Sequence, residues 1–173
     1  MRRHSARSLP CLLAMLVALF ALRTAAAADT LTAEQVLELS SRRAGVACLW
    51  AGGDNVAIEL ARASDLIVCA VGTDEAALNR LRDRALAEGL LGRRLYVVEA
   101  PGDCVPLADG MVDLVVLRSE GGLQLGEAAR LLSPGRGRVV TLEADCVAGQ
   151  DAARAGLEHR GPGLFSRPMP EGA

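Results

Sequence analysis

The sequence predicts an α/β fold in which a doubly wound, mainly parallel sheet of about five strands carries helices on both faces. The chain has 173 residues, 51% of them hydrophobic and 23% charged, a composition typical of one globular domain with a substantial core. Short apolar runs alternate with segments of helical periodicity. These runs are apolar on both faces, so the strands need helices on both sides, joined by right-handed crossovers.

A capping box predicts the start of the first helix. Thr32 is followed three residues later by Gln35, and apolar residues at helical spacing continue to about Arg43. Gly45 is expected to end this helix. Residues 46–50 then form a short apolar run of the strand type.

A glycine-rich turn separates that strand from the second helix. Residues 51–55 read Ala-Gly-Gly-Asp-Asn, and apolar residues recur at helical spacing over 56–61. The next strand is predicted over 66–71. Thr73 is expected to cap a third helix, and Gly89 suits the end of that helix. The order strand, turn, helix, strand indicates parallel βαβ units.

The same alternation continues to about residue 143. Strands are predicted over 95–98, 112–117 and 138–142, with a helix over 123–132 between the last two. From residue 149 onward glycine, proline and arginine become frequent, with one short helix possible over 151–157. We therefore expect residues 29–148 to form the domain and 149–173 to be a Gly/Pro-rich tail or linker.

An export signal is predicted over residues 1–28. Positively charged residues precede an apolar run at 11–22, and small residues at 25–28 suggest cleavage after Ala28. The run is shorter than the ~20 residues of a spanning helix, so no stable membrane insertion is expected after cleavage. The mature protein is expected to be periplasmic or secreted, with an uncleaved anchor as the alternative.

Composition disfavours nucleic-acid binding. The formal net charge is -2 and aromatic residues make up 2% of the chain, so neither a basic field nor stacking platforms are available. His159 is the only histidine after residue 28, which excludes a histidine triad or a histidine metal cluster within one chain. We assign no catalytic residue and no metal ligand.

The cysteines leave their pairing open. Four of the five follow residue 28, and no two have the CxxC spacing of zinc or redox sites. Cys48 and Cys69 fall on strands expected to be neighbours, while Cys104 and Cys146 fall near strand ends or loops. Either pair could form a disulfide. Free buried thiols are favoured for Cys48 and Cys69, because cysteine packs well in cores.

The ligand site is expected beyond the carboxyl ends of the strands. In open α/β sheets a bound group lies there, close to the first glycine turn. The turn at 51–55 is therefore the first candidate. An acid near the end of the second strand would accept hydrogen bonds from ribose hydroxyls; Gly72 occupies that position, and Asp74 follows it.

Several motifs taken together resemble class I methyltransferases that depend on S-adenosyl-L-methionine (AdoMet), over about residues 36–143. They are Leu49-Trp50-Ala51-Gly52-Gly53-Asp54, Val71-Gly72-Thr73-Asp74, Ala87-Glu88-Gly89-Leu90, Val105-Pro106-Leu107-Ala108-Asp109 before Val112-Asp113-Leu114-Val115-Val116, and Leu131-Leu132-Ser133-Pro134-Gly135. The resemblance implies a Rossmann-like fold and AdoMet as cofactor. It places Ala51, Gly52, Gly53, Asp54, Gly72, Asp74 and Asp103 at the cofactor.

The order of these motifs also resembles a methyltransferase-like domain found at the start of certain secreted bacterial proteins. In those proteins the domain precedes a PQQ-type β-propeller. The resemblance implies a propeller or another envelope protein as partner, and it agrees with the predicted export signal.

The chain departs from the family pattern at several positions. The usual Gly-x-Gly-x-Gly motif has Ala51, Gly53 and Asn55 here, so only the central glycine is kept. Ala51 adds a methyl group where the backbone approaches the ligand, whereas asparagine tolerates left-handed backbone. Gly72 replaces the ribose-binding acid. AdoMet is cytosolic, and the chain is expected to stop after the fifth strand, without the family's final strand pair.

Two functions follow. The first is an AdoMet-dependent methyltransferase-like domain of an exported protein, weak or inactive, that binds a small nucleoside ligand. The second is a non-catalytic Rossmann scaffold that acts as a binding or interaction module in the cell envelope. Under the second, Asp54, Asp74 and Asp103 are helix caps or turn residues, and Gly52 and Gly53 form a packing turn.

Overall fold

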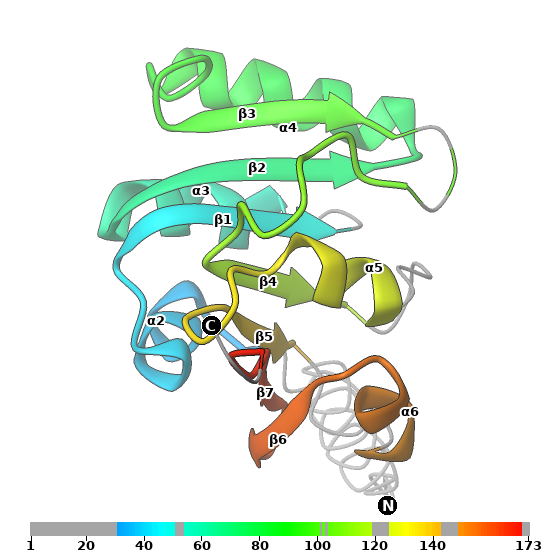
Figure 1. Cartoon of the computed structure of the whole chain (residues 1–173). Coiled ribbons are helices and arrows are strands. Elements are labelled where there is room, and N and C mark those ends of the chain that lie inside the picture. Colours follow the sequence, from blue (N-terminus) through cyan, green and yellow to red (C-terminus); the bar gives the residue numbers. More distant parts are fainter. Residues whose placement is uncertain are drawn as a thin grey trace, which may run out of the picture. The chain divides into compact units, whose positions relative to one another are not determined.

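One sheet of seven strands runs through the computed structural model, with β3-β2-β1-β4-β5-β7-β6 as the strand order (Figure 1). The structure describes residues 31–50, 54–100, 102, 104–118, 125–142 and 149–170, which belong to the compact unit Leu31–Ala173. The strands are β1 (Ala44–Trp50), β2 (Asp65–Gly72), β3 (Leu95–Glu99), β4 (Leu114–Leu117), β5 (Arg138–Thr141), β6 (Glu158–Gly161) and β7 (Leu164–Ser166).

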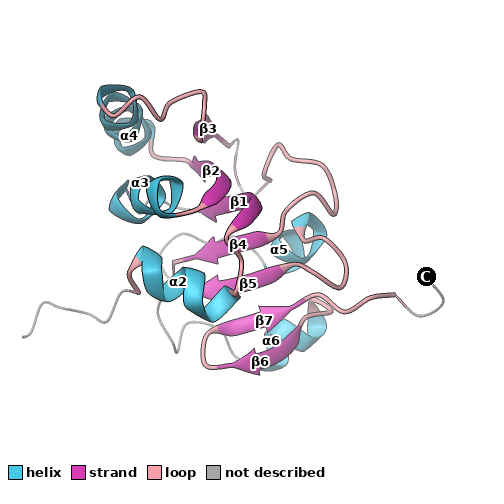
Figure 2. Ribbon diagram, turned by 90° about the vertical axis from the view of Figure 1, so that its left-hand side faces the viewer, coloured by secondary structure: helices cyan, strands magenta, loops and turns pink. Residues whose placement is uncertain are grey.

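Helices cover both faces of the sheet, as Figure 2 shows. One face carries α2 (Ala33–Ser40), α3 (Asp54–Ala63) and α4 (Glu75–Ala87), and the other carries α5 (Leu125–Leu131) and α6 (Gly149–Arg154). Strands β1 to β5 pair in parallel. The predicted doubly wound, mainly parallel α/β fold is confirmed.

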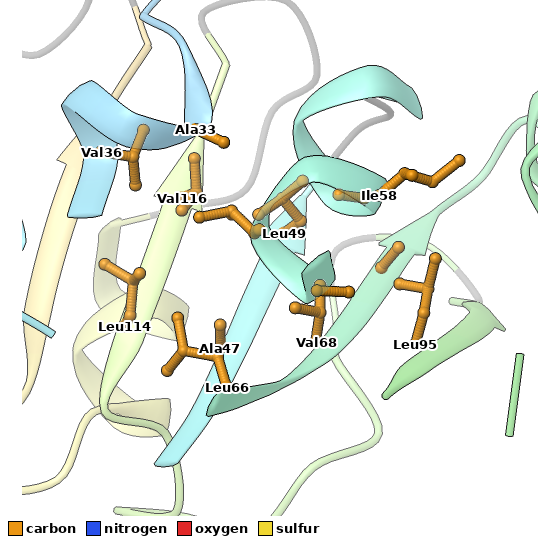
Figure 3. Packing of buried hydrophobic residues seen from close by; sticks show 14 of the residues in the cluster. Ala33, Val36, Ala47, Leu49, Ile58, Leu66, Val68, Leu95, Leu114 and Val116 are labelled. Carbon is orange, nitrogen blue, oxygen red and sulfur yellow. The ribbon is translucent and has the colours of Figure 1, made fainter. Parts of the chain in front are cut away.

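Two hydrophobic clusters form the core because strand residues alternate between the faces. In β1, Ala47 and Leu49 face α2, α3 and α4, whereas Cys48 and Trp50 belong to the cluster on the side of α5. Figure 3 shows the first cluster, in which Leu66 and Leu114 are 0% exposed. Burying a leucine side chain contributes about 1.5–3 kcal/mol, so these positions stabilise the sheet strongly.

The capping box of the first helix is confirmed, but the helix ends earlier than predicted. The Thr32 hydroxyl accepts from the Gln35 N–H at 3.3 Å, and Gln35 Oε1 accepts from the Thr32 N–H at 2.8 Å. The helix ends at Ser40, because Ser41 has φ 53 and donates its N–H to the Glu38 carbonyl. The prediction that this helix continues to about Arg43 was therefore wrong.

Gly45 does not end that helix but belongs to strand β1. Its φ is +111, and a Cβ there would overlap the carboxylate of Asp113. That carboxylate accepts from the Val46 N–H at 3.1 Å. Glycine is needed here because only it combines a positive φ with this close approach.

The described part of the predicted tail is not a linker, and two further strands follow the fifth strand. The described part, 149–170, forms helix α6 and a β6–β7 hairpin, in which Pro162 and Gly163 make the turn. Strand β7 pairs antiparallel with β5, placing Phe165 opposite Val139, and Phe165 is 2% exposed. The buried Phe165 anchors the hairpin, while strand β6 is polar. The apolar periodicity that would predict these two strands from the sequence is therefore weak.

No helix among the described residues combines the length and apolar character needed to cross a membrane. The predicted export signal over 1–28 lies outside the described residues.

Candidate ligand-binding edge of the sheet

Three neighbouring parallel strands end level at one edge of the sheet. Gly72 at the end of β2 lies opposite Glu99 at the end of β3, and Trp50 at the end of β1 lies opposite Val71. The Ala100 N–H donates to the Gly72 carbonyl at 2.9 Å, which extends the pairing past β3. Trp50 is 3% exposed and packs in the core. Ligands of parallel sheets lie beyond such an edge.

The structure places only part of the predicted site. Gly72 and Asp74 lie close together at the end of β2, as predicted. Asp54 is the first residue of α3. Ala51, Gly52, Gly53 and Asp103 lie outside the described residues, so their contact with a ligand stays a prediction.

Asp74 caps helix α4. Its Oδ1 accepts from the N–H groups of Ala76 and Ala77, at 3.0 and 3.2 Å. Thr73 was predicted to be the cap; this was wrong by one residue, because the Asp74 side chain satisfies the free N–H groups of the first turn. The cap alone accounts for an aspartate at this position.

Gly72 leaves the end of β2 without a side chain. The residue is buried, and the neighbouring carboxylate comes from Glu99 on β3, which is exposed. By strand alternation, Glu99 lies on the same face as Val97, toward α3 and α4. Glu99 is not among the predicted site residues, although an acid directly after the apolar run 95–98 is a usable signal.

Asn55, which replaces the last glycine of the expected motif, lies within helix α3. Its Oδ1 accepts from Arg84 Nη1 on α4 at 2.8 Å. The left-handed backbone that asparagine tolerates is therefore not used here. Asn55 instead ties together the two helices that begin at the candidate edge.

Glu127 and Arg130 of α5 hold the connection between β3 and β4, which contains no helix in its described part. Arg130 Nε and Nη2 donate to the two carboxylate oxygens of Glu127, at 2.7 and 2.6 Å. Arg130 also donates to the carbonyls of Leu107 and Val105, at 2.9 and 3.1 Å, and it pairs with Asp109. Glu127 accepts in turn from the Val105 N–H at 2.9 Å.

In this pair, which we call the clamp, the Glu127 carboxylate and the Arg130 guanidinium group both stay charged. The hydrogen bond from Arg130 is the main cause that lowers the pKa of Glu127, against the opposing effect of burial, and the Val105 N–H and the Cys104 thiol add to the lowering. Hydrogen bonds to Glu127 and Asp109 raise the pKa of Arg130. This pair is not among the predicted site residues, although a Glu and an Arg three residues apart on a predicted helix are a usable signal.

The thiols of Cys48 and Cys69 lie in register on β1 and β2, both buried and free. The prediction of free buried thiols is confirmed for this pair. Burial raises the pKa of both thiols, and for Cys48 the neighbouring Cys69 and Glu127 raise it further. Both are therefore protonated and poor nucleophiles. Cys104 is exposed and free, while Cys146 lies outside the described residues.

No family model matches the sequence, and no curated protein is similar to it in sequence. Solved structures share its fold. A SAM-dependent methyltransferase from Aquifex aeolicus superposes with a TM-score of 0.63 at 17% identity, over 80% of this chain and 89% of that protein. SAM is the same cofactor as AdoMet.

Two larger proteins match a smaller part. A Galdieria sulphuraria protein assigned as a sarcosine dimethylglycine methyltransferase has a TM-score of 0.56 at 18% identity, over 63% of this chain and 45% of that one. The geranyl diphosphate C-methyltransferase of Streptomyces coelicolor, solved with Mg²⁺, geranyl diphosphate and S-adenosyl-L-homocysteine, has 0.55 at 19%, over 63% and 43%. The chain thus spans under half the length of these two proteins. The fold is the Rossmann-like fold of SAM-dependent methyltransferases.

Proposed function

We propose that this chain is an exported AdoMet-binding domain of the methyltransferase type, with weak binding and little or no turnover. The observation that carries the proposal is the level edge formed by β1, β2 and β3 in a methyltransferase fold. At this edge an exposed carboxylate, that of Glu99, stands beside the side-chain-free end of β2.

Among the described residues, Glu99 has the chemistry needed to bind the cofactor. A carboxylate beside Gly72 is able to accept hydrogen bonds from the two ribose hydroxyls, while Gly72 leaves space for the sugar. Asp74 fits less well, because its Oδ1 already accepts two N–H groups of α4. When bound, AdoMet supplies an activated methyl group. No described side chain is assigned to its transfer.

Binding is expected to be weak because the acid sits one strand away from its usual place. Each hydrogen bond lost to the ribose costs about 1 kcal/mol, or somewhat less than a factor of ten in affinity. The methyl group that Ala51 adds in place of the expected glycine is predicted to hinder the approach of the ligand to the backbone. Together these changes predict dissociation constants in the high micromolar range.

Calorimetric titration of AdoMet and S-adenosylhomocysteine into the chain without residues 1–28 tests the proposal. Glu99→Gln removes the charge and keeps the size of the side chain, so it should weaken binding by about fivefold to tenfold. Asp74→Asn is the matched control, because asparagine is an equally good helix cap and changes the charge in the same way. The control should bind as the unchanged chain does.

A folded chain that produces no heat at millimolar ligand would refute cofactor binding. Equal weakening by Glu99→Gln and Asp74→Asn would refute the role of Glu99 and point to a general charge effect. Circular dichroism of each variant ensures that only folded protein is compared.

A second candidate function is the non-catalytic interaction module, which a different surface favours. Ile67 on β2 and Tyr96 on β3 are 45% and 44% exposed. Tyr96 lies opposite Cys69, which is two residues after Ile67 on the same face. Exposed apolar side chains on one sheet face suit contact with an envelope protein or a propeller domain. A null calorimetric result would favour this function.

Export is part of the same proposal and rests on the charged and apolar pattern of residues 1–28. Expression of the full chain in a bacterial host, followed by mass measurement of the periplasmic fraction, should detect a chain that begins at Asp29. Recovery of the intact chain from the cytosol alone would contradict export.

A further inference from the structure

A pocket of about 550 Å³ lies at the other end of the sheet from the candidate ligand-binding edge. Two leucines, two serines and three arginines line it, the arginines being Arg42, Arg138 and Arg160. Arg42 precedes β1 and Arg138 begins β5, so the pocket lies at the amino ends of these parallel strands. Figure 2 shows α2 beside β5, with β7 and β6 next to it.

The sequence pattern brings these arginines onto one face. In β5, Val139 packs on the side of α5 and Val140 on the side of α2, so Arg138 shares the α2 face. On β6, Arg160 Nε donates to the Ser166 hydroxyl of β7 at 2.8 Å. Arg42 follows the left-handed residue that ends α2.

Two of the guanidinium groups share one backbone acceptor. The Arg136 carbonyl accepts from Arg42 Nη2 at 2.7 Å and from Arg138 Nη1 at 3.1 Å. Within the described part of the chain, neither Arg42 nor Arg138 forms an ion pair, and Arg42 Nε is buried without a hydrogen-bond partner. The two positively charged guanidinium groups are thus held close together, and some of their N–H donors have no acceptor.

The only carboxylate paired with this group in the described residues is that of Glu158, which accepts from Arg160 at 2.5 Å. Burial lowers the pKa of Arg138, and the charges of Arg42 and Arg160 lower it further. The cluster therefore carries an uncompensated positive charge. Unpaired, half-buried arginines cost stability, and an anion between them would remove that cost.

We propose that the pocket bounded by Arg42, Arg138 and Arg160 is a binding site for a small organic phosphate. Guanidinium groups present planar forks of N–H donors that match phosphate oxygens in pairs. The volume exceeds that of a phosphate ion and falls within the range of small-molecule sites, so the phosphate carries an organic substituent.

The site is independent of the proposed cofactor function. It lies at the amino ends of the strands, whereas the proposed AdoMet site lies at their carboxyl ends. A phosphate can reach it either as a free metabolite or as the headgroup of a lipid, and both present the same chemistry to the arginines.

Calorimetric titration of glycerol 3-phosphate into the chain without residues 1–28 tests the free ligand, and vesicles containing phosphatidic acid test the lipid headgroup. Arg42→Gln and Arg138→Gln should each weaken binding by about tenfold or more, because each removes a charged donor. Arg80→Gln is the matched control, since Arg80 is exposed on α4 and the variant loses the same charge.

Binding of either ligand that both pocket variants weaken and Arg80→Gln leaves unchanged supports the proposal, and the responding ligand identifies the source. Equal weakening by all three variants would show non-specific attraction and overturn it, as would no binding of either ligand. Thermal unfolding ensures that each variant is folded. Arg160→Gln, on the exposed hairpin strand, replaces any variant that fails to fold.

Discussion

The two faces of the sheet are covered in different ways. One face is covered by the three helices α2, α3 and α4, which pack on it through an aliphatic cluster built mainly from leucine, valine and alanine. On the other face, α5 and α6 cover the strands together with a connection that has no helix in its described part. There Arg130 and Glu127 hold the connection to α5 by hydrogen bonds to the carbonyls of Leu107 and Val105 and to the Val105 N–H.

The difference shows that a half-buried ion pair that forms several hydrogen bonds to the backbone can take the place of a packed helix. A helix satisfies its own backbone groups, whereas an irregular connection depends on side chains to do so. The Leu107 carbonyl depends in this way on Arg130, which also donates to the Val105 carbonyl. Stability on this face should therefore depend on single charged residues, which the other face does not require.

Replacing Arg130 by methionine should have the largest effect. The substitution keeps much of the side-chain volume but leaves Glu127, 14% exposed, without its bidentate partner. It also removes the Arg130 donor from the Leu107 carbonyl and one of the two donors to the Val105 carbonyl, which keeps the Leu107 N–H at 2.8 Å. We expect a loss of about 2–3 kcal/mol in the free energy of unfolding, measured by urea denaturation.

Arg62→Met on the opposite face is the matched control. Arg62 pairs with Glu88 at 2.9 Å, but its side chain is 59% exposed, and exposed ion pairs contribute less than about 1 kcal/mol. If the two variants lose equal stability, Arg130 is only one of many surface charges and the proposed difference between the faces is wrong.

Sequence patterns predicted the first five strands because each is an apolar run bounded by turn residues or helical segments. They failed for β6 and β7, where Glu158, His159 and Arg160 resemble a solvated segment. Only the pairing of β6 with β7, which itself pairs with β5, makes those residues a strand. Such non-local pairing leaves little trace in a short polar segment.

The candidate site was predictable to a similar degree. The positions of Gly72 and Asp74 followed from the end of a buried strand and the start of a helix. The roles of these residues did not follow, because the cap made by Asp74 and the proximity of Glu99 to Gly72 depend on side-chain geometry and strand register. Arg42, Arg138 and Arg160 lie far apart in sequence, and only the sheet order brings them together.

The pH dependence of stability should sharpen the comparison by a smaller effect. Arg130 lowers the pKa of Glu127 in the folded chain, so folding favours the ionised carboxylate. This contribution is complete above the pKa of the unfolded chain, about 4.3 for glutamate, and is lost as the pH falls through the lower pKa of the folded chain. Urea denaturation from pH 7 down to pH 3 should therefore show a smaller loss of stability in Glu127→Gln than in the unchanged chain.

The control is Glu88→Gln, which alters the exposed ion pair on the other face. This variant should lose stability between pH 7 and pH 3 more nearly as the unchanged chain does. Identical profiles for Glu127→Gln and the unchanged chain would mean that the clamp is not ionised as described, and the two faces would then differ in packing alone.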